Sequence, residues 1–118
     1  MHTAEDAYWA LRYGEDPQFM DVREMEETNI ERSVGFHFVP LSALKQEGAK
    51  ALDDCLNKEA PLYVHSSSED TGEPAMEAAE LLEAMGFQDV RVLQGGLRML
   101  KAQGFMTEHG GKYRFIDS

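Results

Sequence analysis

The segment from Pro61 to Leu93 restricts the fold of this chain more than any other part of the sequence. It begins with the short apolar run "LYVH" (62–65), and Pro74–Met85 then carries apolar residues on one helical face and glutamates on the other. Gly86 is placed to end that helix as a left-handed cap, and "DVRVL" (89–93) gives a second apolar run. Two buried strands with a helix between them form the unit from which parallel sheets are built.

Helix and strand patterns alternate along the rest of the chain as well. Thr3 can cap a first helix that Gly14 ends, and "GGLRMLKAQG" (95–104) is typical of a closing helix. Two further apolar runs, "QFMDV" (18–22) and "GFHFVPL" (35–41), predict short strands. We therefore predict an α/β fold with three layers, in which a central parallel sheet carries helices on both faces.

The region before the run "LYVH" contains the cysteine of this chain. Ser42 stands where a helix cap is expected, and the apolar face of the helix it would start extends to Asn57 and includes Cys55. Free cysteine is among the most buried residue types, so we expect Cys55 to pack in the core. Because Cys55 is the sole cysteine, an internal disulfide and a zinc site with several thiolates are excluded.

Length and charge narrow the classes of function. The chain has 118 residues, the size of one domain, and we expect a single domain over 1–118. Asp and Glu number 22 against 11 Lys and Arg, and the net charge of -11 argues against nucleic acid and membrane partners. The first residues do not follow the signal-peptide pattern, and no apolar run approaches the roughly 20 residues of a bilayer span, so we expect a cytoplasmic protein.

Four segments together carry a family resemblance: "FMDVREMEE", "VPLSAL", "PLYVHS" and "AAELLEAMGFQDVRVLQGGLRML". In this order and at these intervals they resemble the rhodanese homology domain, from about residue 4 to 102. Residues 103–118 would then form a C-terminal extension. The resemblance implies a rhodanese-like fold.

In the rhodanese family, the loop after the central strand begins with a cysteine that carries sulfur as a persulfide, cradled by backbone N–H groups. The resemblance places Ser66 at this position, so the active-site cysteine is expected to be lacking. Asp21 and Arg23 match residues that are structural in the family, and we assign them no catalysis. The candidate binding loop comprises Ser66, Ser67, Ser68, Glu69, Asp70, Thr71, Gly72 and Glu73.

This loop is about three residues longer than the usual sulfurtransferase loop and is acidic. It carries Glu69, Asp70 and Glu73 where the family tends to offer arginine. Three carboxylates beside a pocket of amides would repel anions such as thiosulfate. A basic peptide, an amine or a cation would suit the loop mouth instead.

The same part of the sequence, together with Cys55, allows three alternatives to a binding loop. Ser66 as a nucleophile would need a base, but His65 should point to the opposite side of the strand end. Cys55 as a relocated sulfur carrier would need to be accessible. A metal site of His65, Glu69, Asp70 and Glu73 matches no recognised ligand spacing, so we expect no metal and no cofactor.

The two ends of the chain give further expectations. The pair Gly110–Gly111 lies between alternating runs and predicts a C-terminal hairpin. In the family an edge strand usually precedes the first helix, but there is almost no room for one before Thr3. We expect "KYRFI" (112–116) to cover that sheet edge instead.

The sequence therefore predicts a rhodanese-like domain that is inactive as a sulfurtransferase and works as a binding or regulatory module. Its partner would be an unknown protein or a small basic ligand. The alternative is an enzyme, namely a divergent sulfurtransferase or a phosphatase-like protein that uses Cys55 or Ser66.

Overall fold

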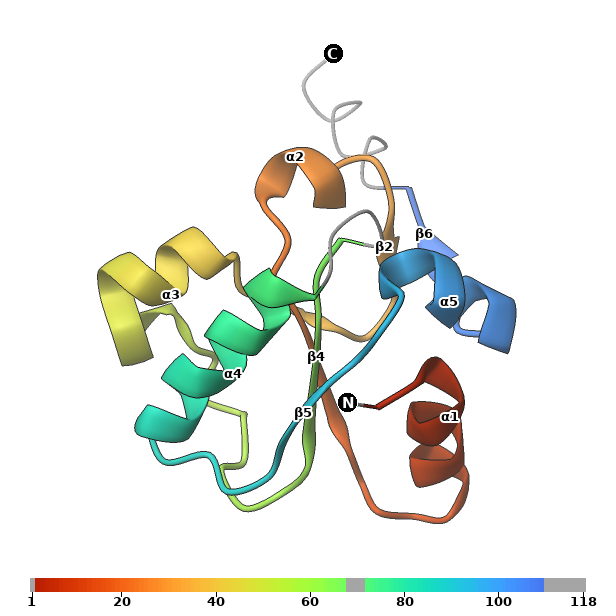
Figure 1. Cartoon of the computed structure of the whole chain (residues 1–118), viewed down its shortest axis with the longest axis horizontal. Coiled ribbons are helices and arrows are strands. Elements are labelled where there is room, and N and C mark those ends of the chain that lie inside the picture. Colours follow the sequence, from red (N-terminus) through yellow and green to blue (C-terminus); the bar gives the residue numbers. More distant parts are fainter. Residues whose placement is uncertain (1, 68–71, 110–118) are drawn as a thin grey trace.

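The computed structural model describes residues 2–67 and 72–109, which form short helices and strands in alternation (Figure 1). In chain order these are α1 (Ala4–Arg12), β1 (Gln18–Asp21), α2 (Met25–Thr28), β2 (Arg32–Ser33), β3 (His37–Phe38), α3 (Leu41–Glu47), the 3-10 helix η1 (Gly48–Ala51), β4 (Leu62–His65), α4 (Glu73–Ala84), β5 (Val90–Val92), α5 (Gly96–Gln103) and β6 (Thr107–Glu108).

Four of these strands form a parallel sheet in the order β3-β1-β4-β5. The register pairs Gln18 with Leu62 at one end of β1 and β4, and Asp21 with His65 at the other. This confirms the predicted parallel sheet and the strand at 62–65 as a central one. It also brings the last residues of β1 and β4 side by side at the carboxyl edge of the sheet.

Helices cover both faces of the sheet, with α3 and α4 on one side and α1 and α5 on the other (Figure 1). Successive strand residues alternate between the two layers. Phe19 and Tyr63 belong to the core beneath α1 and α5, whereas Met20 and Val64 belong to the core beneath α3 and α4. The three-layer prediction is therefore confirmed.

The helix ends explain where several elements begin and stop. Thr3 Oγ1 accepts a hydrogen bond from Asp6 N at 3.1 Å, and Asp6 Oδ2 accepts one from Thr3 N at 2.9 Å. This reciprocal capping box starts α1 at the predicted residue. Gly86 follows α4 with a φ of 107°, the left-handed conformation expected for it.

The predicted helix from Ser42 to Asn57 is wrong in both its start and its length. Pro40 caps α3, and Ser42 lies inside the helix, where its hydroxyl donates to Glu24 Oε1 at 2.7 Å. Gly48, with a φ of 58°, ends α3 and leads into η1. The apolar stripe is therefore interrupted, and Cys55 is exposed rather than packed in the core.

A small antiparallel pair and the residue before Thr3 complete the described fold. β2 pairs with β6 through Arg32 and Glu108 and through Ser33 and Thr107. At the outer edge of β5, His2 N donates to Val92 O at 2.8 Å and accepts, through its own carbonyl, from Gln94 N at 2.9 Å. One residue before Thr3 thus pairs with the sheet edge. The predicted hairpin around Gly110 and the segment 112–116 lie outside the described residues.

None of the helices in residues 2–67 and 72–109 combines the length and the apolar character needed to cross a lipid bilayer.

Candidate functional site

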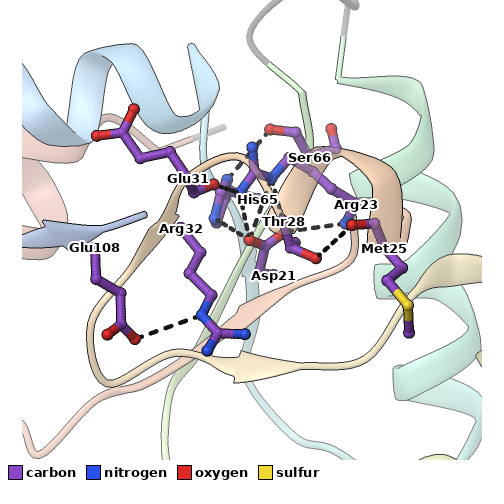
Figure 2. Close-up of polar contacts among 9 residues, drawn as sticks. All are labelled: Asp21, Arg23, Met25, Thr28, Glu31, Arg32, His65, Ser66 and Glu108. Carbon is purple, nitrogen blue, oxygen red and sulfur yellow. Dashed lines mark hydrogen bonds and ion pairs between the residues drawn. The ribbon is translucent and has the colours of Figure 1, made fainter. Parts of the chain in front are cut away.

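Buried polar side chains gather where β1 and β4 end (Figure 2). Asp21 is the last residue of β1, and His65 is the last residue of β4. Arg23 lies two residues after β1, and Ser66 directly follows β4. All four residues are buried, from 0% exposed for His65 to 8% for Arg23. A buried polar group costs free energy unless it is paired, so the contacts of these four define the site.

Asp21 and Arg23 form a buried ion pair. Arg23 Nη2 donates to Asp21 Oδ2 at 2.9 Å, Nε donates to Oδ1 at 3.1 Å, and the backbone N of Arg23 also donates to Oδ1 at 2.9 Å. Nη2 further donates to the carbonyl oxygen of Glu31 at 2.7 Å. The guanidinium therefore connects the chain after β1 to the segment after α2.

His65 faces Asp21 from the neighbouring strand. Its Nε2 lies 3.5 Å from Asp21 Oδ2 and has no hydrogen-bond partner among the described residues, while Nδ1 lies 3.2 Å from the backbone oxygen of Ser66. Burial raises the pKa of the Asp21 carboxyl, but the His65 ring and the Arg23 guanidinium outweigh burial and hold that pKa at about 2. Asp21 therefore stays ionised through the ordinary pH range.

Ser66 lies at the start of the connection between β4 and α4. The two ring nitrogens of His65 are directed at Asp21 and at the Ser66 backbone, so His65 is not placed as a base for the Ser66 hydroxyl. Gly72, with a φ of 88°, precedes α4, and Glu73 is its first residue. The predicted loop residues Ser68, Glu69, Asp70 and Thr71 lie outside the described residues.

An open pocket of about 720 Å³ lies beside this connection. Ser67 forms part of its wall, and the remaining lining residues come from the segment after β1 and from α5. The lining consists of Arg23, Glu27, Ile30, Glu31, Ser67, Leu97, Arg98, Lys101 and Ala102. The sequence predicts Ser67 as a loop residue and Arg23 as a structural residue, but it gives no indication of the wall that α5 supplies.

The described wall of this pocket has mixed charge. Lys101 Nζ lies 2.9 Å from Glu31 Oε2, and Thr107 donates to the same carboxylate oxygen at 2.6 Å. These contacts hold the pKa of Glu31 below its ordinary value. Arg98 and Glu27 line the pocket without an ion-pair partner among the described residues. The mouth is therefore not uniformly acidic on the side that α2 and α5 form.

Residues 4–103 match the sequence model of the Rhodanese-like domain. The chain belongs to the rhodanese-like family. The match spans nearly the same residues as the resemblance carried by the four sequence segments. The predicted family is therefore confirmed.

Solved structures with the same fold cover most of this chain. The Alr3790 protein from Anabaena sp. is 27% identical, with a TM-score of 0.74 over 98% of both chains. Thiosulfate sulfurtransferase from Pseudomonas aeruginosa is 26% identical, with a TM-score of 0.69 over 90% of this chain and 19% of that one. A rhodanese-like domain protein from Staphylococcus aureus shares the fold, with 22% identity and a TM-score of 0.67 over 88% of this chain and 93% of that one. No curated protein matches the sequence.

Cys55 of the rhodanese-like domain lies apart from the connection that begins at Ser66. It belongs to the segment between η1 and β4, where Asn57 N donates to Gln18 Oε1 at the amino end of β1. Ser66 instead follows the carboxyl end of β4. The thiol and the predicted loop therefore belong to different segments of the chain, one before β4 and one after it.

Proposed function

We propose that this rhodanese-like domain does not transfer sulfur at the loop after β4 and acts as a binding or regulatory module. The observation that carries the proposal is Ser66, which occupies the start of the connection between β4 and α4. By family resemblance this is the position of the persulfide-carrying cysteine. A serine hydroxyl does not ionise near neutral pH and cannot form a persulfide, whereas a thiol at a helix start is readily ionised.

The buried framework beneath the loop supports a binding role. Asp21, Arg23 and His65 are buried and contact one another. The ends of β1 and β4 are therefore well packed although the loop begins with a serine. A fixed framework lowers the entropic cost of ordering a bound partner. The domain therefore has a well-packed support for binding at the loop after β4, the place where it lacks the family's nucleophile.

The pocket beside Ser67 suggests what the module binds. Arg98 offers a cation and Glu27 a carboxylate, both without an ion-pair partner among the described residues. Glu69 and Asp70 follow Ser67 and Ser68 in the sequence and add two carboxylates to this part of the chain. We therefore propose a partner protein segment that carries basic residues together with an acidic one, which narrows the expected partner, an unknown protein or a small basic ligand. The net charge of -11 favours association with a basic partner at low salt. We also propose that the protein acts in the cytoplasm.

A thiosulfate and cyanide assay tests the absence of sulfur transfer. We expect the wild type to form no thiocyanate above the protein-free rate. The Ser66→Cys variant measures whether the backbone cradle survives: partial turnover in this variant would show that only the sulfur atom is lacking. Thiocyanate formed by the wild type and persulfide detected on it by mass spectrometry would overturn the proposal.

A second candidate function is a divergent sulfurtransferase that uses Cys55. The exposure of this thiol favours it, because a sulfur carrier must be reached by its donor and acceptor. Turnover that disappears in Cys55→Ala would establish this function. Turnover that persists in Cys55→Ala would exclude Cys55 as the sulfur carrier and contradict this second function, since the sequence contains no other thiol.

Binding at the pocket is tested with short peptides of defined charge. Amide chemical shifts of the labelled protein are followed during titration with Lys-Lys-Lys, Glu-Glu-Glu and Lys-Glu-Lys. We expect the mixed peptide to shift Ser67 and Arg98 most strongly, and the shifts to weaken in Arg98→Ala. Arg12→Ala, on the exposed face of α1, is the matched control. Equal shifts across the whole surface would contradict binding at this pocket.

A further inference from the structure

Three side chains with different ligand atoms converge at a second place on the molecule. His37 belongs to β3, while Asp53 and Cys55 belong to the segment between η1 and β4. One ligand atom from each lies within 4.8 Å of the other two. His37 Nδ1 lies 3.3 Å from Asp53 Oδ2. A nitrogen, an oxygen and a sulfur ligand thus lie close together.

The backbone on both sides of this trio is held by the fold. His37 pairs with Met20 in the parallel sheet, and its side chain is 25% exposed. Leu52 and Leu56 flank the Asp53–Cys55 segment and pack against the core beneath α3 and α4. The N–H of Leu56 donates to the carbonyl oxygen of Asp53 at 3.2 Å and closes a turn. The three ligands are therefore presented by anchored backbone, although the Asp53 and Cys55 side chains reach solvent.

The distances suit a tetrahedral ion after a small side-chain movement. Zinc bonds of about 2.0–2.3 Å place neighbouring ligand atoms roughly 3.3–3.8 Å apart. His37 and Asp53 already have this separation. Because Cys55 is exposed, rotation of its side chain can bring the sulfur closer without displacing packed neighbours.

We infer that His37, Asp53 and Cys55 form a binding site for a zinc-like divalent cation, with the fourth position open to water or to an external ligand. Imidazole and thiolate select borderline and soft ions over calcium and magnesium, which prefer oxygen ligands. On binding, the Cys55 thiol releases its proton to solvent, and the thiolate and the Asp53 carboxylate together balance the charge of the ion. This site stands apart from Ser66 and does not depend on the proposed function.

Cobalt(II) provides a direct probe, because a thiolate ligand gives a sulfur-to-cobalt charge-transfer band and tetrahedral coordination gives intense visible bands. The reduced full chain is titrated with Co²⁺ in a buffer that contains a phosphine reductant, and Zn²⁺ is then added. We expect one Co²⁺ per chain, a charge-transfer band that saturates, and loss of the cobalt spectrum as zinc displaces cobalt. Affinity should rise with pH because the thiol must lose its proton.

Variants decide whether all three side chains hold the ion. Cys55→Ser should abolish the charge-transfer band, and His37→Ala and Asp53→Asn should each weaken cobalt binding at least about tenfold. Asp54→Asn, in the same turn and with the same change in charge, and His2→Ala should leave the affinity unchanged. No charge-transfer band, a band insensitive to His37→Ala and Asp53→Asn, or one metal per two chains would each overturn the inference.

Discussion

The Arg23 guanidinium and the Asp21 carboxylate are joined by three side-chain hydrogen bonds of 2.9, 3.1 and 3.2 Å, and both residues are less than a tenth exposed. A buried pair of this kind is costly to break from one side, since the remaining charge stays desolvated. The carbonyl oxygen of Glu31 would also lose its donor. The pair therefore holds the chain where β1 leaves the sheet.

Arg23→Ala should lower the free energy of unfolding by about 3 kcal/mol, because it leaves Asp21 buried without its cation. Urea denaturation of wild type and variant measures this difference. Lys45→Ala is the control, as it removes an exposed ion pair to Glu77 and should cost less than about 1 kcal/mol. Similar losses in the two variants would contradict the importance of burial at Asp21.

Acid should destabilise the protein in part through Asp21. Its folded-state pKa of about 2 lies below the ordinary value of 3.8, so its contribution is complete above about pH 5 and is lost as the pH falls toward 2. The shift corresponds to about 2 kcal/mol. Unfolding free energies measured from pH 5 to pH 2 should therefore fall more steeply in the wild type than in Asp21→Asn. Parallel slopes would show that Asp21 titrates normally.

Cys55 should react as an exposed thiol. We expect one equivalent of a disulfide reagent to modify the native chain without unfolding it, and saturating Zn²⁺ to slow the reaction. Cys55→Ser should change the unfolding free energy by less than about 0.5 kcal/mol, as expected for a surface substitution. A thiol that reacts only in denaturant would show that Cys55 is buried, as the sequence alone predicts.

Gly95 should be intolerant of a side chain. It caps α5 with a φ of 84°, and a Cβ there would lie 2.9 Å from Met99 Cβ and overlap Met99 Cγ. Gly95→Ala should cost about 2 kcal/mol or more, since strain in the left-handed region is added to the overlap. Gly14→Ala is matched in φ at 75° but meets no atom within 4 Å, so its cost should stay near 1 kcal/mol. Thermal unfolding of the two variants compares them.

The layers of this fold could be predicted from local patterns, whereas α3 could not. The strand at 62–65 and the helix after Pro74 carry strong apolar periodicity, and both were confirmed. Leu44, Ala51 and Cys55 also have helical spacing, but Gly48 adopts a positive φ and ends α3 between them. A periodic pattern that crosses a glycine therefore overstates the length of the helix, and for the same reason it wrongly predicts that Cys55 packs in the core.

The candidate site was found only where its residues are close in sequence. Asp21 and Arg23 are two residues apart, and their family motif identified them. The approach of His65 to Asp21 depends on the register of β1 and β4, and the Arg98 wall depends on how α5 lies beside the segment after β1. The double glycine at the start of α5 marks the beginning of a helix in the sequence. The direction of α5 toward the pocket, however, depends on the tertiary structure.

The pairing of His2 with the edge of β5 occupies two backbone groups that would otherwise be open at that edge of the sheet. The Val92 carbonyl and the Gln94 amide are both occupied by the backbone of His2. These are the groups that an incoming strand from another molecule would need for hydrogen bonding. Displacing His2 would expose both groups, so this residue protects that part of the β5 edge from pairing with another strand as well as leading into α1.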